Sequence, residues 1–266
     1  MNELSGEHKS FLKKQKIKNL TVLASQIGLL LFFLLFWELA AKRSWVDAFL
    51  VSSPSRIWKT LVDLNRSGQL FLHIWISLYE TVLGFVIGTL SGALIAVALW
   101  WSQMLRRVLE PYVVVLNSLP KIALGPILIV WFGTGQKSIV AMAVLISVVV
   151  TTLNMLAGFL ETNPQKVLLL ETMNACKFQV FTKLVFPANL STLISALKIN
   201  VGMAWIGTIM GEYLSSRAGL GYLIVYGSQV FRMDLVMACT VVLCTLAGLM
   251  YALVAAAEKR LVRWKS

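Results

Sequence analysis

Six long apolar stretches, separated by shorter polar segments, dominate the pattern of this chain. Each approaches or exceeds the ~20 residues that an α-helix needs to cross the hydrocarbon core of a bilayer. The stretches cover roughly residues 20–41, 76–100, 111–133, 138–160, 193–213 and 235–257. The pattern predicts an all-α, polytopic membrane protein with six transmembrane helices.

Small residues and prolines mark two of these stretches. In the second, glycine recurs every four residues at Gly84, Gly88 and Gly92, a spacing that favours close packing of two membrane helices. The third contains Pro120 and Pro126 and is expected to kink.

Two segments outside the apolar stretches also have a pattern of their own. Residues 53–64 begin with Ser-Pro and continue with apolar residues at helical spacing, which predicts an amphipathic helix at the membrane surface. Residues 211–234 are too polar and glycine-rich for a full span and too apolar for a plain loop. They are expected to form a partly embedded, re-entrant segment.

A charged, amphipathic stretch at residues 161–187, ETNPQKVLLLETMNACKFQVFTKLVFP, lies between the fourth and fifth apolar stretches. Asn174 separates two sets of apolar residues that recur at helical spacing. The sets are Val167, Leu168, Leu170, Met173 and Ala175, and then Phe178, Phe181, Val185 and Phe186. These residues leave two interpretations open: a docking element for a soluble partner, or an ordinary connection on the lipid surface.

Composition and charge favour a membrane protein. Of the 266 residues, 58% are hydrophobic and only 14% are charged, whereas soluble domains are nearer a quarter charged. The net charge of +12 comes from Lys and Arg between the apolar stretches, which orient a membrane protein more readily than they bind nucleic acid. With both termini in the cytoplasm, the inner segments hold roughly twice as many Lys and Arg residues as the outer ones.

The predicted layout is one domain in the plasma or inner membrane. A cytoplasmic tail over residues 1–19 precedes a transmembrane domain over residues 20–257, and a second cytoplasmic tail covers residues 258–266. The absence of a small-residue cleavage site after the first apolar stretch favours an uncleaved first span.

No pattern predicts catalysis. Both histidines precede the core and lack a partner nucleophile or acid. The segment GTGQKS at 133–138 has Gln136 where a phosphate-binding loop needs Gly before its Lys. The cysteines, Cys176, Cys239 and Cys244, lack metal-ligand spacing and are expected to be small packing residues. We expect no catalytic residue, metal or cofactor on this chain.

Residues 170–191, LETMNACKFQVFTKLVFPANLS, resemble the cytoplasmic "EAA" loop of binding-protein-dependent ABC importer permeases. That loop has Glu-Ala-Ala, three residues, Gly, and an amphipathic stretch that ends in Pro. Counting back from Pro187 places Asn174 at the Gly position, where Asn is the best other residue for a left-handed helix end. The motif Glu is absent, and Glu171 lies three residues after its position.

Four other blocks extend the resemblance to the nitrate, sulfonate and taurine subgroup, which also includes permeases for thiamine-pyrimidine precursors. They are SPSRIWKTL (53–61), HIWISLYETVLGFVIG (73–88), LPKIALGPILIVWFGTG (119–135) and GEYLSSRAGLGYLIVYGSQVF (211–231). The resemblance implies a type I ABC importer permease fold and a pore of two permeases, here expected as a homodimer. It also implies a separate ATP-binding subunit, an extracytoplasmic solute-binding protein, and transport by alternating access.

The resemblance places the ATPase-coupling site in the loop at residues 161–190. The residues expected to couple to the ATPase are Leu168, Leu169, Leu170, Glu171, Asn174, Ala175, Cys176, Lys177, Phe178 and Pro187. Lys177 and Phe178 suit insertion into a groove of a partner, because a lysine can pair with an acidic rim and an aromatic ring can fill an apolar pocket. The open alternative is that Lys177 and Phe178 are an interfacial charge and a headgroup anchor.

Polar residues inside the spans are candidates for the translocation pathway. They are Asn117, Lys121, Trp205, Thr208 and Glu212. For Asn117, Trp205 and Thr208, a helix–helix hydrogen bond is an equal alternative. Lys121 suits an anionic substrate, and its alternatives are a structural pair with Glu80 or snorkelling to the inner surface. Glu212 fits an outer gate or a helix cap, and His73 is interpreted as an interface residue without ligand role.

A different class, an ion-coupled secondary transporter, is the alternative. Such transporters usually show inverted repeats and midplane carboxylates. This chain shows no repeat and few buried acids, so an importer permease for a small solute is favoured. A membrane-bound enzyme lacks a catalytic constellation. Sulfonate, taurine, nitrate and a pyrimidine precursor all remain open as the solute.

Overall fold

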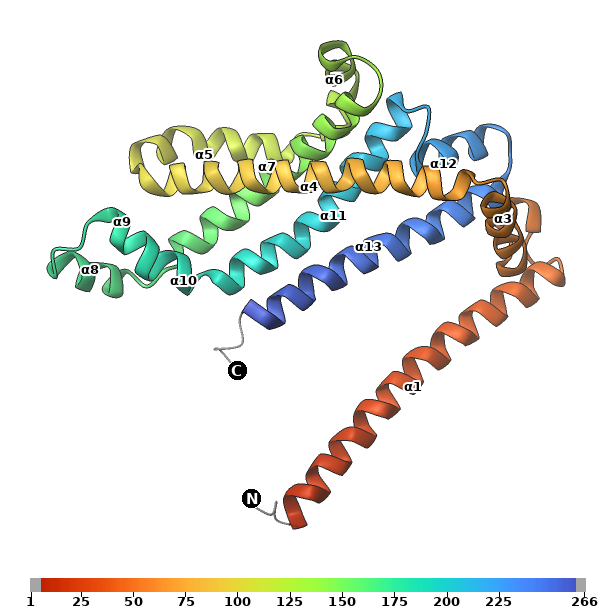
Figure 1. The fold of residues 1–266 in the computed structure, drawn as a ribbon, viewed down its shortest axis with the longest axis horizontal. Coiled ribbons are helices and arrows are strands. Elements are labelled where there is room, and N and C mark those ends of the chain that lie inside the picture. The colour runs from red at the N-terminus through yellow and green to blue at the C-terminus, as the bar shows by residue number, and fades with distance from the viewer. Residues whose placement is uncertain (1–5, 262–266) are drawn as a thin grey trace.

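Helices account for all the regular structure that the computed structural model shows over the described residues 6–261 (Figure 1). Five are long and apolar enough to cross a membrane. They are α1 (Gly6–Lys42), α4 (Gln69–Trp101), α7 (Gln136–Leu160), α11 (Leu190–Ser215) and α13 (Met233–Leu261). Five of the six predicted spans are therefore confirmed as helices. Helix α1 begins well before the predicted start at residue 20, and the other four lie within a few residues of the predicted bounds, except that α4 begins seven residues earlier than predicted.

The third predicted span, 111–133, is not one kinked helix. Helix α5 (Gln103–Ser118) is followed by a 3₁₀ turn, η1 (Lys121–Leu124), and by α6 (Gly125–Phe132), and the two parts diverge by 94°. Leu119 is extended, as the residue before a proline must be, and Pro120 has no N–H to continue a helix. The predicted kink is therefore confirmed as a complete break, and the described residues hold up to six candidate spans if this bent pair counts as one.

Helix α7 lies between α4 and α11 at the centre of the bundle. The glycine stripe of α4 faces small side chains of α7, with Gly84 against Ala143 and Gly88 against Ser147. A methyl group at either glycine would overlap the facing side chain. The close helix packing predicted from the glycine spacing is confirmed.

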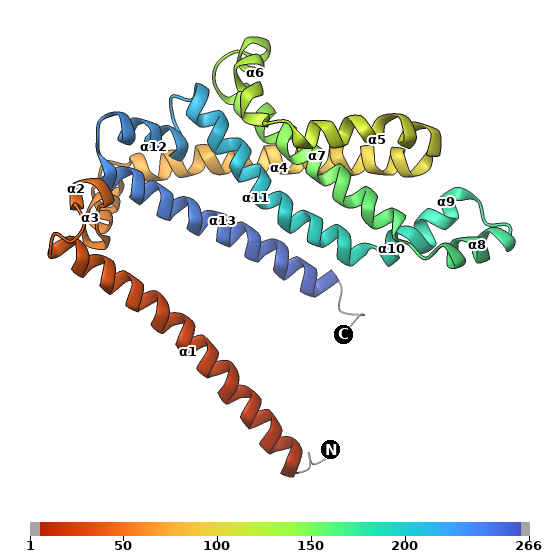
Figure 2. The same ribbon diagram turned by 180° about the vertical axis from the view of Figure 1, so that it is seen from behind.

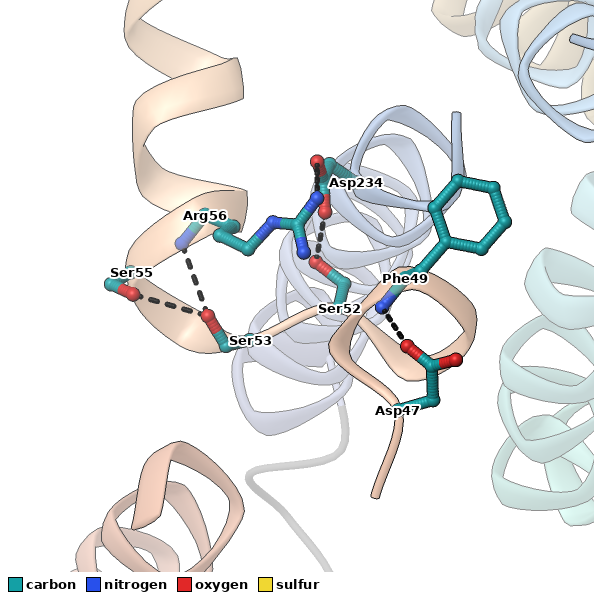
Figure 3. Close-up of polar contacts among 7 residues, drawn as sticks. All are labelled: Asp47, Phe49, Ser52, Ser53, Ser55, Arg56 and Asp234. Carbon is teal, nitrogen blue, oxygen red and sulfur yellow. Dashed lines mark hydrogen bonds and ion pairs between the residues drawn. The ribbon is translucent and has the colours of Figure 1, made fainter. Parts of the chain in front are cut away.

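One end of the bundle, called the α12 end, gathers α2 (Ala48–Val51), α3 (Pro54–Arg66) and α12 (Leu220–Gln229) (Figure 2). The Ser53 hydroxyl caps α3, whose first residue is Pro54, as the Ser-Pro pattern predicts. Figure 3 shows Asp234, in the first turn of α13, accepting hydrogen bonds from Ser52 Oγ at 2.7 Å and from Arg56 at 2.9 Å. These contacts hold α3 against α13.

The opposite end, called the α8 end, carries the short helices of the charged stretch (Figures 1 and 2). They are α8 (Pro164–Thr172), α9 (Lys177–Val180), a π-helical turn η2 (Phe181–Val185) and α10 (Phe186–Ala188). Lys198 and Glu258 form a 2.5 Å ion pair that joins α11 to α13 near this end.

Helix α1 diverges from the bundle (Figures 1 and 2). Its contacts are chiefly with α2 and α3, and Glu38 accepts hydrogen bonds from the backbone and hydroxyl of Ser55. Its apolar side chains between residues 20 and 36 are mostly exposed. The helix begins at Gly6, inside the predicted tail 1–19, while residues 1–5 and 262–266 of the two predicted tails lie outside the described residues.

Candidate functional site

The charged stretch folds into a hairpin of short helices, called the α8–α10 hairpin. The Asn163 side chain caps α8 by accepting a hydrogen bond from Gln165 N at 2.8 Å. Asn174 has a left-handed backbone with φ of 61°, and Ala175 N donates back to the carbonyl of Leu170 at 3.0 Å. This geometry is a glycine-type helix end, so the substitution of Asn for Gly is accommodated.

The predicted extent of the first helix was too long. Met173 and Ala175 were expected on its apolar face, but α8 ends at Thr172 and both residues belong to the turn around Asn174. The pattern continued past the helix because Ala175 packs against the same core as Val167 and Leu170.

The second half of the hairpin is fastened to the bundle. The Cys176 N–H donates to the side chain of Gln179 at 2.9 Å, which closes the first turn of α9. Lys177 Nζ donates to the carbonyl oxygen of Trp101, at the end of α4, at 2.7 Å. Phe181 packs its ring against Trp100 and Phe159, with centroid distances of 5.0 and 5.5 Å.

The hairpin has one buried and one exposed apolar face. Val180 and Val185 are buried in a core shared with α4, α7 and α11. Five large apolar side chains are instead exposed: Leu168 and Leu169 (each 60%), Met173 (72%), Phe178 (62%) and Phe186 (45%). Glu171, Asn174 and Cys176 are exposed on the same hairpin. The structure therefore presents an apolar surface with no partner among the described residues.

The packing interpretation of the cysteines is only partly right. Cys239 is buried, but Cys176 is exposed on the hairpin and Cys244 is exposed on α13. Cys176 is the N-cap residue of α9, and its side chain lies on the exposed surface of the hairpin although Ala175 beside it packs against the core.

A second group of polar side chains, called the Glu212 cluster, lies at the α12 end. Glu212 of α11 is fully buried and accepts hydrogen bonds from Ser77 Oγ and Gly221 N, both at 2.5 Å. Ser77 Oγ in turn accepts the N–H of Leu220 at 2.8 Å. Of the two roles considered for Glu212, the geometry matches a cap for the first turn of α12.

His73 belongs to the same cluster, which corrects its interpretation as an interface residue. It is buried, its Nδ1 accepts the N–H of Gly219 at 2.9 Å, and its ring stacks on Tyr222. His73, Ser77 and Glu80 follow each other at helical spacing on one face of α4. That polar stripe in an otherwise apolar helix is the sequence signal that would have found this cluster.

The pathway candidates fall into two groups. Asn117 and Lys121 lie together at the break between α5 and α6, where Lys121 Nζ donates to the carbonyl of Asn117 at 2.9 Å. Trp205 and Thr208 are buried on α11, and each has a polar atom without a hydrogen-bond partner among the described residues. Within that same part of the chain, no ion pair joins Lys121 to Glu80, so the suggested structural pair is not present.

Comparisons with known proteins agree on one family. Residues 84–263 match the family described as "Binding-protein-dependent transport system inner membrane component". The chain is 35% identical to the formylaminopyrimidine transport permease protein of Halalkalibacterium halodurans, over 72% of this chain and 77% of that protein. It is 28% identical to a putative aliphatic sulfonates transport permease protein of Bacillus subtilis, over 86% and 83% of the two chains.

The fold also matches solved structures. One is a chain of a bacterial ABC transporter involved in the import of the acidic polysaccharide alginate, with a TM-score of 0.65. The match covers 94% of this chain and 99% of that one at 15% identity, so it bears on the fold alone. The predicted type I importer permease fold is confirmed.

Proposed function

This chain belongs to the family of binding-protein-dependent transport system inner membrane components, and we propose that its α8–α10 hairpin couples it to an ATPase subunit during import of a small solute. As a member of that family it is a membrane-spanning permease subunit, and ATP hydrolysis takes place on a separate subunit. The rest of the proposal concerns which surfaces do the coupling, how the chain pairs, and which solute passes.

The exposed apolar surface of the hairpin is the observation that carries the proposal. Large apolar side chains such as Phe178 and Met173 are costly to leave in water. The backbone between them makes turn and capping hydrogen bonds at Ala175 and Cys176. A preformed helical surface of this kind suits insertion into a groove of a soluble partner. Because Lys177 and Phe181 fasten the hairpin to α4, movement of such a partner would be transmitted to a transmembrane helix.

Charge supports an orientation with the hairpin and both termini in the cytoplasm. The α8 end is rich in Lys, including Lys166, Lys177 and Lys183, as expected for inner segments. This places the α12 end, with the Glu212 cluster, on the outer side, where a solute-binding protein would deliver its cargo.

A second copy of the chain is proposed to complete the pore. Helix α5 buries none of its residues and α1 leaves most of its apolar surface exposed, so both offer surface to another subunit. Asn117 and Lys121 lie on the uncovered α5–η1 segment. A second copy facing that segment would place both residues beside the pathway, with Trp205, Thr208 and Glu212 behind them in the bundle.

The solute proposed is small and belongs to the classes that the resemblance to the nitrate, sulfonate and taurine subgroup implies. A sulfonate, taurine, nitrate or a pyrimidine precursor of thiamine is compatible with this assignment. The solute-binding protein that works with this permease would hold the same solute, and its ligand would identify the solute.

Affinity purification of the tagged permease, co-expressed with the ATPase subunit of its own transporter, tests the proposed function. Wild-type permease should retain the ATPase, and Phe178→Asp should lose most of it because a charge cannot enter an apolar groove. Phe71→Asp, which puts the same charge at another exposed phenylalanine, on α4 at the α12 end, is the matched control. Retention of the ATPase by Phe178→Asp would contradict the assignment of the hairpin.

A further inference from the structure

The turn that ends α12 holds a bulky residue where glycine is usual. The N–H of Arg232 donates to the carbonyl of Gly227 at 2.7 Å, and the N–H of Phe231 donates to the carbonyl of Ser228 at 3.3 Å. These two bonds define a left-handed helix end, in which the residue after the cap has a positive φ. That residue is Phe231, with a φ of 55°, whereas Asn174 holds the similar turn of the hairpin. A bulky side chain is strained in this region, which glycine and asparagine adopt more readily.

Burial does not explain why a phenylalanine occupies this position. The Phe231 side chain is 64% exposed, and Val230 and Tyr226 beside it are 43% and 42% exposed. These three side chains, called the α12 tip, form an apolar patch at the last turn of α12. Strained backbone that does not serve packing is typical of functional positions, so the α12 tip is a candidate contact surface.

The α12 tip is held in place from two sides. Tyr226 stacks on Tyr222, which stacks on His73 of α4, with centroid distances of 6.3 and 6.2 Å. A methyl group at Gly227 would lie 3.0 Å from Val236, so α12 and α13 are in close contact at this point. A surface that is ordered in advance loses little conformational entropy when a partner binds it.

Polar groups around the α12 tip indicate a protein partner with an acidic surface. Ser228, Gln229 and Arg232 are exposed next to the apolar side chains, which gives an apolar centre with a polar rim, as in protein interfaces. With the proposed orientation, the outer segments 42–72 and 216–232 hold five and two Lys or Arg residues against two Asp residues. Basic residues gather mainly on the inner side of membrane proteins, so this outer excess suits an acidic partner.

We infer that the α12 tip is a docking point for the external solute-binding protein, with the Phe231 ring in an apolar pocket of that protein and Arg232 against an acidic group at the pocket rim. The inference rests on the proposed function, because it takes the α12 end to be the outer side. A lipid-headgroup anchor fits the tip less well. Such anchors are chiefly Trp and Tyr, and they need no left-handed backbone.

Asparagine at position 231 separates docking from folding. Phe231→Asn removes the ring and keeps a residue that tolerates the turn, so the melting temperature of the permease should stay equal or rise. The affinity of the solute-binding protein of the same transporter is measured by biolayer interferometry on the permease–ATPase complex in lipid nanodiscs. That affinity should fall at least about tenfold in Phe231→Asn. Phe71→Asn, at another exposed phenylalanine of the α12 end, is the matched control and should stay within about threefold of wild type.

Arg232→Gln tests the charged rim. Its association rate with the solute-binding protein should be lower than that of wild type and should depend less on salt concentration. An unchanged salt dependence would overturn the assignment of Arg232. Unchanged affinity in Phe231→Asn, the result expected of a lipid anchor, would overturn the docking point. Affinity lost together with a lower melting temperature would also overturn it, because the ring would then serve the fold.

The outcome is separable from that of the proposed function. The hairpin lies at the opposite end of the bundle, so Phe231→Asn should still retain the ATPase. Retention of the ATPase by Phe178→Asp would contradict the coupling assignment and leave the effect of Phe231 on the solute-binding protein measurable. Loss of the ATPase from Phe178→Asp, with no effect of Phe231→Asn on that affinity, would overturn the docking point alone.

Discussion

Lys177 donates a hydrogen bond of 2.7 Å to the carbonyl oxygen of Trp101, and this contact ties the α8–α10 hairpin to the end of α4. Helix α4 has 33 residues and therefore runs about 50 Å. At its other end, Ser77 and His73 hold the segment that begins α12. One continuous helix thus contacts both the candidate docking surface and the Glu212 cluster.

This relationship predicts that Lys177→Met weakens coupling without preventing assembly. The variant loses a charge-assisted hydrogen bond to the last carbonyls of a helix, an interaction worth about 0.3–1 kcal/mol at a partly exposed helix end. Solute-dependent ATPase activity of the reconstituted complex should fall severalfold while the ATPase still co-purifies. Lys183→Met removes an exposed lysine of the same hairpin that has no partner among the described residues, and it should behave as wild type. Equal ATPase activity of the two variants would show that the contact between Lys177 and Trp101 does not transmit movement from the hairpin to α4.

The backbone of Asn174 predicts opposite effects of two substitutions. Asn174→Gly should be neutral or slightly stabilising, because glycine adopts a φ of 61° without steric cost. Asn174→Val should cost about 1–2 kcal/mol, because a β-branched residue is strained in the left-handed region. Thermal unfolding of the purified permease, with co-purification of the ATPase as a second measurement, distinguishes them. Indistinguishable melting temperatures would mean that the turn is not held in this conformation.

The close contact between α4 and α7 predicts sensitivity at Gly88. Gly88→Leu should destabilise the bundle by at least about 1–3 kcal/mol, since the new side chain overlaps Ser147 on α7. Gly202→Leu on α11 is the matched control, because the space around that glycine is open. Fluorescence-detected size-exclusion chromatography after heating measures the thermal stability of both variants. A Gly88 variant as stable as the Gly202 variant would contradict the packing.

The capping role of Glu212 predicts a local effect on α12. Glu212→Ala leaves the N–H groups of Gly221 and Tyr222 without an acceptor, which should cost about 0.5–2 kcal/mol, as for the loss of an N-cap. Hydrogen exchange over residues 216–229 should accelerate, while exchange in α8 stays unchanged. Glu212→Gln keeps one acceptor oxygen and should be intermediate. Unchanged exchange in both variants would exclude the cap.

Much of this architecture was predictable because single residues determine it locally. Three features follow from the sequence because short-range patterns determine them. They are the long apolar helices, the close packing at the glycines of α4 and the Ser-Pro start of α3. Asn174 was identified as a left-handed helix end for the same reason. The angle between α5 and α6 was not predictable, because Pro120 sets the position of a break but not its direction.

The Glu212 cluster depends on contacts between residues more than a hundred positions apart. The polar residues of α4 and Glu212 each stand out in an apolar helix, but the sequence does not pair Ser77 with Glu212, because only the packing of α11 against α4 brings them together. Likewise, the partner of Lys177 is a backbone carbonyl, which no side-chain pattern encodes. Such pairs require the tertiary structure.

Cys176 offers the most direct test of the central claim, that the α8–α10 hairpin is a cytoplasmic docking surface for the ATPase. It is an exposed native thiol at the start of α9, two residues before Phe178. A membrane-impermeant maleimide should label the permease in inside-out vesicles and not in intact spheroplasts, and binding of the ATPase should protect it. Cys176→Ser, which retains Cys239 and Cys244, gives the background. Labelling of Cys176 from the outside, or labelling that the ATPase does not reduce, would contradict the account.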